Sequence, residues 1–280
     1  MLNQKELHEK ILYPVVRVRT DKAGGSGTII YSQPNPEIPD EYLSFVMTCE
    51  HVIDDAITYR KDFHPVLKKD TKIEIMKQVD VEIFDYVKMS RINSSNSHKA
   101  DILAYDKTHD IAILKLDSPK QCPYIAKIIP KDKIADVKLF EPAMSSGCSL
   151  GHEPFFNDGR ITYLSEMIDN KLYWMTNCSS IFGNSGGAIF LTETGEQVGI
   201  TARISALQLG FGMDIITWMG FATAPQRIYE FFDEQELKFL YDSSDTFKKA
   251  MARRDKKAKA ALMTRVRSDE AGEPSDEDND

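Results

Sequence analysis

The apolar residues of this 280-residue chain occur in short runs that are rich in β-branched and aromatic side chains. Clusters of turn-forming residues separate these runs, as at Ala23–Gly27, Pro34–Pro36 and Asn93–Ser97. Short runs between such turns predict β-strands. Many strands without long intervening helices favour a barrel or sandwich over a parallel α/β sheet, so the pattern predicts an all-β fold.

The predicted strands fall into two sets of roughly six, which would form two six-stranded antiparallel β-barrels. The first set covers residues 13–18, 28–31, 43–48, 73–75, 79–86 and 111–116, and the second covers 137–140, 160–164, 171–175, 188–191, 197–200 and 218–222. The segment Thr192–Glu196 is predicted to be a hairpin turn. Trp174 and Trp218 are expected in the core.

Four segments are expected along the chain. Residues 1–12 carry a short N-terminal helix, 13–120 the N-terminal β-barrel, 121–235 the C-terminal β-barrel with a closing helix near 228–232, and 236–280 a charged helix and tail. Basic residues crowd the part from 248 to 259, whereas 268–280 holds seven acidic residues, a proline and a glycine. Such a composition buries too little apolar surface to fold, so this last part is predicted to be disordered.

The overall composition excludes several classes of function. A net charge of −8 disfavours general nucleic-acid binding, although the basic segment 248–259 leaves such a contact open. No apolar run approaches the roughly 18 residues that span a bilayer, and the N-terminus lacks the apolar stretch of a signal peptide, which favours a cytoplasmic location without membrane contact. The four cysteines lie far apart, so free thiols are expected rather than disulfides or a zinc site.

The segment Gly183-Asn184-Ser185-Gly186-Gly187 is the strongest chemical signal. A serine hydroxyl is a weak nucleophile, so it needs a base within hydrogen-bond reach and donors for the oxyanion that forms. Glycines let the main chain turn sharply and bring N–H groups to the substrate carbonyl. We therefore expect Ser185 to be a nucleophile and the main chain of Gly183, Asn184 and Ser185 to form an oxyanion hole.

The same pentapeptide also fits the nucleophile elbow of α/β-hydrolases, in which the catalytic histidine follows the serine along the chain. All six histidines of this chain precede Ser185. A hairpin pattern, rather than a helix, follows the segment. The α/β-hydrolase alternative is therefore excluded.

An upstream base and acid are present in suitable contexts. His51 follows a predicted core strand, and Asp110 leads the apolar run Ile111–Leu116. A carboxylate beside the imidazole would hold the correct tautomer and stabilise the imidazolium. Asp101 and Asp106 are competing candidates on a more polar segment, but the strand-leading position favours Asp110. Its neighbour His109 is expected to be a solvated loop residue.

Taken in order, these motifs resemble the trypsin-like serine peptidases, and within them the HtrA-type branch. The matching segments are Gly25–Ile30, Thr48–Val52, Asp110–Lys115, Gly183–Gly187, Val198–Ile200 and Gly220–Ala222. The resemblance covers about residues 13–235 and implies the chymotrypsin-like double barrel. It implies a serine endopeptidase with the triad His51, Asp110 and Ser185, acting through an acyl-enzyme without metal or cofactor.

The resemblance also implies where a protein or peptide substrate binds. An extended peptide would pair with the strand edge at Thr201, Ala202 and Arg203, and Ser179 would lie at the floor of the primary specificity pocket. A serine there, rather than an aspartate, predicts an apolar or small side chain in the pocket. No PDZ-sized domain is expected after residue 235. The alternative function is a catalytically silent scaffold that binds proteins through its charged tail; the oligomeric state stays open.

Overall fold

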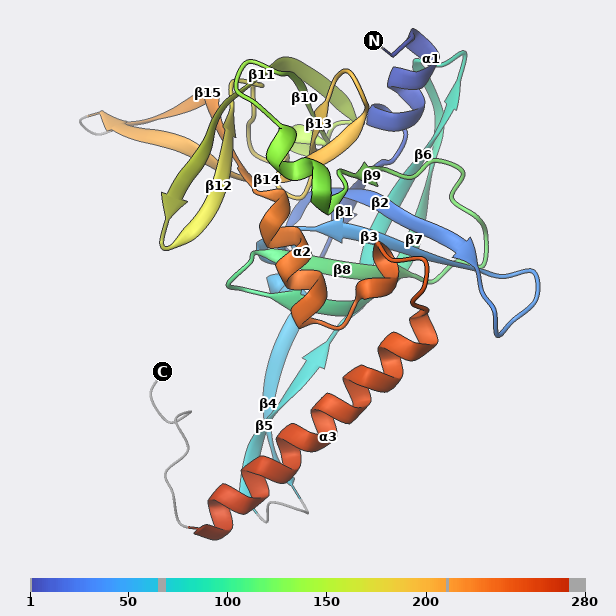
Figure 1. The fold of residues 1–280 in the computed structure, drawn as a ribbon, viewed down its shortest axis with the longest axis vertical. Coiled ribbons are helices and arrows are strands. Elements are labelled where there is room, and N and C mark those ends of the chain that lie inside the picture. Colours follow the sequence, from blue (N-terminus) through green and yellow to red (C-terminus); the bar gives the residue numbers. More distant parts are fainter. Residues whose placement is uncertain (1, 65–68, 210–211, 272–280) are drawn as a thin grey trace. The chain divides into compact units, whose positions relative to one another are not determined.

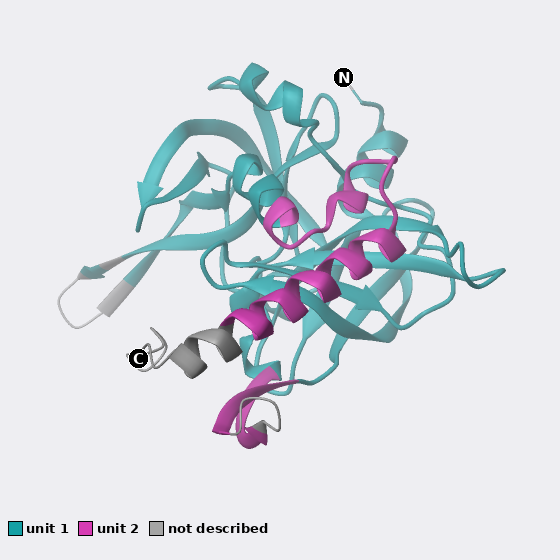
Figure 2. Cartoon of the chain, turned by 60° about the horizontal axis from the view of Figure 1, so that its bottom comes forward, with its two compact units in different colours: residues 1–56, 76–231 teal, residues 57–75, 232–280 magenta. Residues whose placement is uncertain are grey.

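The computed structural model describes residues 2–64, 69–209 and 212–271. The chain forms two compact units, residues 1–56 with 76–231 and residues 57–75 with 232–280 (Figure 2). The first unit holds two closed antiparallel barrels of six strands each (Figure 1). The predicted all-β fold with two barrels, a short N-terminal helix and a C-terminal helix is therefore confirmed.

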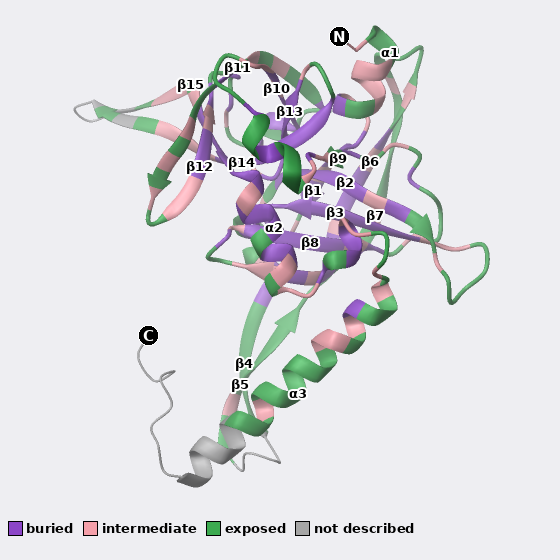
Figure 3. Ribbon diagram, viewed as in Figure 1, coloured by how far each residue is buried: buried purple, intermediate pink, exposed green. Residues whose placement is uncertain are grey.

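The first barrel closes in the order β1-β2-β3-β8-β7-β6. Its strands are β1 (Val15–Arg19), β2 (Gly24–Pro34), β3 (Tyr42–Thr48), β6 (Val79–Val87), β7 (Arg91–Asp106) and β8 (Ile111–Leu116). β3 and β8 pair side by side, with Thr48 opposite Ala112. Their β-branched and aromatic residues, including Phe45, Val46 and Ile113, are fully buried because they fill the barrel and its outer contacts (Figure 3).

Two predicted turns of this barrel are wrong, because both segments are paired strand. Residues 24–27 belong to β2, where the glycines provide close packing: a Cβ at Gly25 would lie 2.7 Å from the Val52 side chain, and one at Gly27 would lie 2.7 Å from Val46. Asn93–Ser97 lies within β7. Its polar side chains are exposed, and the Asn96 amide donates to Asp85 on the neighbouring strand β6 (2.6 Å). This part of the strand is therefore stabilised by main-chain pairing and cross-strand hydrogen bonds rather than by burial of apolar side chains.

The second barrel closes in the order β13-β10-β11-β12-β15-β14, since β14 also pairs with β13, and the short β9 (Lys127–Ile128) adds to β14 in parallel. Its strands are β10 (Pro142–Gly147), β11 (Phe155–Ile168), β12 (Lys171–Thr176), β13 (Ala188–Leu191), β14 (Glu196–Leu209) and β15 (Gly212–Thr223). The predicted turn Thr192–Glu196 falls between β13 and β14.

One predicted strand of the second barrel is misplaced. Residues 137–140 form no strand, because Phe140 adopts the left-handed conformation (φ 73°) and its side chain is 76% exposed. The strand begins instead at Pro142, a position where proline is tolerated because the first residue of a strand need not donate. Trp174 is buried as expected, but Trp218 is 64% exposed on β15.

Short helices flank the barrels. The N-terminal helix comprises α1 (Gln4–Leu7) and a π-helical turn (His8–Leu12), and Asn3 and Glu6 cap its start reciprocally. Ile11 packs in one core cluster with Val15 and Phe190. The closing helix α2 spans Pro225–Glu234. Short 3₁₀ helices are formed by Glu50–Val52, Asp54–Ala56, Lys131–Asp136, Ser149–Gly151 and Lys238–Leu240.

The second unit contains the two-stranded sheet of β4 (Ile57–His64) and β5 (Lys69–Met76), except Met76, and the long helix α3 (Phe247–Ala271). The predicted strand 73–75 therefore lies in this sheet and not in the first barrel. Within the second unit, Arg253 of α3 forms ion pairs with Glu236 (3.0 Å) and Asp245 (2.5 Å). Most residues of α3 from 247 to 264 are exposed (Figure 3). The segment 268–280 is predicted to be disordered; its first four residues belong to α3, which ends at Ala271, and residues 272–280 lie outside the described residues. Within the described ranges, no helix is long and apolar enough to cross a membrane.

Candidate active site

His51 and Asp110 meet at one end of the first barrel. His51 lies in the 3₁₀ turn that follows β3, and Asp110 immediately precedes β8, so the pairing of these two strands brings both residues together. The imidazole Nδ1 lies 2.9 Å from each carboxylate oxygen of Asp110, and the main-chain N–H of His51 donates to Oδ1 (3.1 Å). Asp110 adopts the left-handed conformation (φ 56°), which aspartate tolerates better than most residues.

The environment of His51 determines its protonation. Burial of the ring acts to lower its pKa, but the hydrogen bond and the charge of Asp110 outweigh burial and raise the pKa of His51 above its ordinary value, with smaller contributions from Glu50 and Asp54. The His51 side chain is nevertheless 43% exposed, against 16% for Asp110. The pair is therefore a carboxylate-oriented imidazole that solvent and ligands can reach.

Ser185 lies in a tight turn whose carbonyl groups point into the protein. The carbonyl of Phe182 accepts from the Leu150 N–H (2.8 Å), and that of Ser185 accepts from the Ser26 N–H (2.8 Å). Gly183 and Gly186 both have positive φ (92° and 84°), which only glycine adopts at little cost. Among residues 2–64, 69–209 and 212–271, the N–H groups of Gly183 and Ser185 have no acceptor, whereas that of Asn184 donates to Ile181 (3.1 Å).

Sequence reasoning missed three residues that hold this turn. Ser26, which is fully buried, donates from Oγ to the Gly183 carbonyl (2.7 Å) and accepts from the Cys148 N–H (2.7 Å). The buried Asn184 side chain accepts from Ser149 Oγ and donates to Ser180 Oγ (3.3 Å). A small polar residue between the glycines of Gly25–Gly27 was the available signal for Ser26; Ser149 and Ser180 gave none.

The predicted substrate-binding residues lie in different places relative to this turn. Thr201 of β14 is joined to it directly: its N–H donates to the Gly187 carbonyl (2.8 Å) and its carbonyl accepts from the Gly186 N–H (2.9 Å). Ala202 is buried, and it lies where the pairing of β14 with β15 shifts register between Thr201 and Arg203. The Arg203 guanidinium lies over the Tyr173 ring (5.4 Å) and 3.5 Å from Asp169.

Ser179 precedes the turn and is itself exposed, between the buried residues Cys178 and Ser180. Its carbonyl accepts from the Asn157 side-chain amide (3.0 Å), and the next residue, Ser180, donates its N–H to Thr217 on β15 (2.8 Å). This segment is thus tied to both β11 and β15. No hydrogen bond joins the Ser179 side chain to the serine turn within the described part of the chain.

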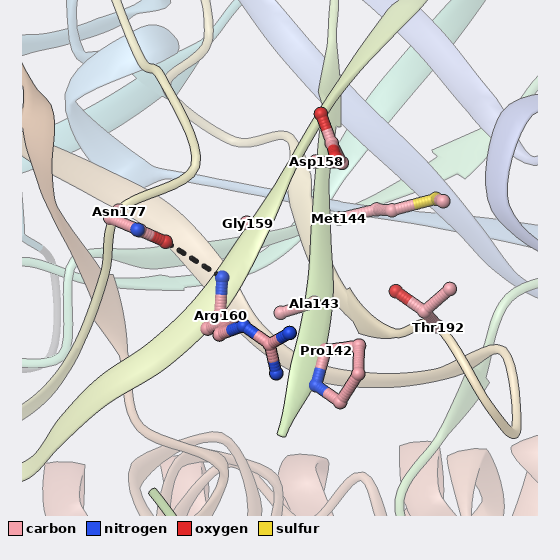
Figure 4. Close-up of a pocket in the computed structure, with 8 residues that line it drawn as sticks. All are labelled: Pro142, Ala143, Met144, Asp158, Gly159, Arg160, Asn177 and Thr192. Atoms are coloured by element: carbon pink, nitrogen blue, oxygen red, sulfur yellow. Dashed lines mark hydrogen bonds between the residues drawn. The ribbon is translucent and has the colours of Figure 1, made fainter. Parts of the chain in front are cut away.

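Two hollows lie in the second barrel. One, of about 570 Å³, adjoins the serine turn and is lined by Ser149, Leu150, His152, Glu153, Pro154, Phe155 and Ile181. The other, of about 270 Å³, is lined by the residues drawn in Figure 4, where Asn177 accepts from the Arg160 N–H (2.7 Å). None of the predicted site residues lines either hollow. The first hollow is linked to the serine turn, because Ser149 in its lining donates to the Asn184 side chain and Leu150 donates its N–H to the Phe182 carbonyl.

Cys49 is the third side chain beside the His51–Asp110 pair. The thiol sulfur and the ligand atoms of His51 and Asp110 all lie within 4.8 Å of one another, a separation from which a metal ion could be held. Cys49 is, however, fully buried; its thiol donates to the Thr201 carbonyl (3.4 Å), and burial raises the pKa of the thiol well above its ordinary value. A thiol that resists deprotonation is a poor metal ligand, so Cys49 acts as a buried packing residue. All four cysteines are free and buried.

Comparison with known proteins identifies similar sequences and folds. A family model described as trypsin-like peptidase domain matches residues 25–200. The solved structure of the HtrA-type protease AlgW with a tripeptide superposes with a TM-score of 0.58 at 16% identity, covering 85% of this chain and 64% of that one. A serine endoprotease from Yersinia pestis gives a TM-score of 0.53 at 18% identity, covering 84% and 66%. The chain thus spans about two thirds of the length of these proteins; comparison with curated proteins gave no match.

Proposed function

The chain belongs to the trypsin-like peptidase family, and we propose that it is a serine endopeptidase in which Ser185, His51 and Asp110 form the catalytic triad. The single observation that carries this proposal is the pairing of His51 Nδ1 with the Asp110 carboxylate at 2.9 Å. This bond leaves Nε2 of a partly exposed imidazole to act as the base. The serine turn, with the free N–H groups of Gly183 and Ser185 among the described residues, supports it.

The proposed reaction is acyl transfer. Ser185 Oγ attacks the carbonyl carbon of the scissile bond while His51 Nε2 takes the hydroxyl proton. The N–H groups of Gly183 and Ser185 donate to the oxyanion of the tetrahedral intermediate. His51 then gives its proton to the leaving amine as the C–N bond breaks, and a water molecule activated by His51 hydrolyses the ester. Asp110 keeps its charge throughout and stabilises the imidazolium.

The proposed substrate is an extended protein or peptide segment. Its main chain would pair with β14 at Ala202 and Arg203, directly after Thr201, whose own N–H and carbonyl are already bonded to the serine turn. The hollow beside the turn offers apolar side chains, of which Leu150 is 66% and Phe155 is 36% exposed, and would take an apolar substrate side chain. Within this proposal Ser179 contributes no charge to the recognition of the substrate.

Cleavage of an unfolded protein tests the proposed function. We expect purified wild-type protein to cut casein at internal bonds, with products identified by mass spectrometry, and the Ser185→Ala variant to cut none. The control is the Ser97→Ala variant, which should keep the same rate within about threefold because Ser97 is exposed on β7, outside the proposed triad and substrate-binding residues. A folded wild-type protein that leaves casein and a peptide library intact would contradict the proposal and favour a silent scaffold.

The raised pKa of His51 predicts a pH dependence. Attack by Ser185 requires the neutral imidazole, so activity is lost as pH falls through the pKa of His51. Because this pKa is raised, we expect kcat/KM to reach half of its plateau above about pH 6.5, the ordinary value for histidine. The measurement is kcat/KM with one peptide substrate between about pH 5 and 9. A midpoint clearly below the ordinary value would contradict the assignment of Asp110 as the partner of His51.

A further inference from the structure

Arg227 of α2 is a buried cation that the proposed reaction does not use. The residue is only 4% exposed, and its guanidinium group lies over the ring of Tyr173 at 4.9 Å from the ring centre. Its N–H groups donate to three main-chain carbonyls: Thr108 (3.0 Å), His109 (2.7 Å) and Leu172 (3.4 Å). One side chain therefore joins the closing helix, strand β12 and the turn that precedes Asp110.

The cost of burying this charge suggests a specific role. A buried guanidinium is expensive to desolvate unless it is paired, and within the described residues no carboxylate lies within ion-pair distance of Arg227. Carbonyl dipoles and an aromatic face compensate for only part of this cost. A leucine or methionine of similar length would fill the same space without a charge, so packing alone does not account for the residue.

The carbonyls that Arg227 binds belong to the turn that presents Asp110. Within this turn the His109 N–H donates to Asp106 Oδ1 (2.7 Å), and Asp110 follows in the left-handed conformation. The expectation that His109 is solvated is wrong: the residue is 8% exposed, and its ring meets that of Phe231 edge-on. The reason is that Arg227 and Phe231, both on α2, hold the turn against the closing helix.

We infer that Arg227 is a positioning residue, which fixes the Thr108–His109 carbonyls and thereby keeps the Asp110 carboxylate aligned with His51 Nδ1. The inference rests on the proposed function for its kinetic consequence but not for its structural one. One nitrogen of the guanidinium, Nη2, donates to both successive carbonyls, and the planar group holds its neighbour Nη1 toward the Leu172 carbonyl; a lysine ammonium would not hold this fixed arrangement of donors. Without the guanidinium, the left-handed Asp110 turn would sample other conformations and the carboxylate would lose its place beside the imidazole.

Substitutions of Arg227 are expected to change kcat and the pKa of His51. In Arg227→Ala, kcat should fall by about 100-fold, as misplacement of a catalytic group by about 1 Å can produce, while KM changes by less than about twofold. The kcat of Arg227→Lys should lie between that of the wild type and that of the alanine variant. The NMR-measured pKa of His51 should drop in Arg227→Ala toward its ordinary value, because the contact with Asp110 is weakened.

The deciding measurements are kinetics, titration of His51 by NMR and chemical rescue. Millimolar guanidinium should enter the space left in Arg227→Ala and restore most of kcat, while equal concentrations of potassium chloride or urea should not. The matched control is Arg254→Ala, which also removes an arginine that donates to a main-chain carbonyl, that of Gln235, but in the other compact unit. This control should retain wild-type kcat and the wild-type pKa of His51.

Two results would overturn the inference: an Arg227→Ala protein with wild-type kcat and His51 pKa, or a loss of kcat that guanidinium does not restore while the His51 pKa stays unchanged. If Arg227→Ala fails to fold, the same measurements on Arg227→Lys decide. The NMR titration needs no substrate. If the wild-type protein proves inactive, that result contradicts the proposed function, while the titration still decides whether Arg227 aligns Asp110.

Discussion

Replacing Asp110 with asparagine is expected to lower kcat by about 10⁴-fold without unfolding the protein. The substitution preserves the shape of the side chain but removes the negative charge of the carboxylate, which accepts hydrogen bonds from the main-chain N–H and from Nδ1 of His51. An amide beside Nδ1 stabilises the wrong tautomer of the imidazole and gives no support to the imidazolium that forms during attack. Steady-state kinetics on a peptide substrate, with circular dichroism to verify folding, measures the effect.

The matched control for this substitution is Asp101→Asn. Asp101 is exposed on β7, where it accepts from the Gln78 side chain (2.9 Å), and it was the competing candidate for the acid of the triad. The control should keep kcat within about twofold, as expected of an exposed residue outside the site. A large loss of activity in Asp101→Asn together with an active Asp110→Asn would refute the assignment of Asp110.

Replacing Gly186 with alanine is expected to cost about 4 kcal/mol or more of the free energy of unfolding, enough to leave little folded protein. Gly186 has a φ of 84°, and a Cβ there would lie 2.1 Å from the Ser26 carbonyl oxygen and 2.2 Å from Thr48 Oγ1. Both atoms belong to strands of the first barrel, so neither moves without disturbing the barrel core. Urea denaturation followed by circular dichroism measures the loss.

The control for Gly186→Ala is Gly151→Ala, which separates backbone strain from the clash. Gly151 also has a positive φ, 74°, but a Cβ there would meet no atom within 4 Å. The control should therefore lose only the conformational cost, about 1–2 kcal/mol. Equal losses in the two variants would contradict a tight contact between the serine turn and the first barrel.

Parts of this fold were predictable because its signals are local. The apolar run of β3 ends at Thr48, shortly before His51, and that of β8 begins directly after Asp110, so both strands follow from the sequence pattern. The contact between His51 and Asp110 joins residues 59 positions apart and was predictable only from the order of the motifs. The closing helix likewise shows its apolar face at Ile228, Phe231 and Phe232. In these places local propensity and burial agree.

Other parts depend on contacts between distant residues and could not be predicted. Ser94 and Asn96 lie in a strand because both side chains bond to Asp85 on β6, and glycines 25 and 27 lie in a strand because neighbouring side chains leave no room for a Cβ. The burial of His109 depends on Arg227, which is 118 residues away in sequence. The domain boundaries, the catalytic roles and the cytoplasmic location stay predictions.

The most direct test of the central claim is labelling of the purified protein with a fluorophosphonate probe, which reacts with an activated serine. We predict that the wild type is labelled at Ser185, located by peptide mass spectrometry, and that Ser185→Ala and His51→Ala are not labelled. Absence of labelling in folded wild-type protein, or labelling that persists in His51→Ala at the wild-type rate, would contradict a triad built from these residues.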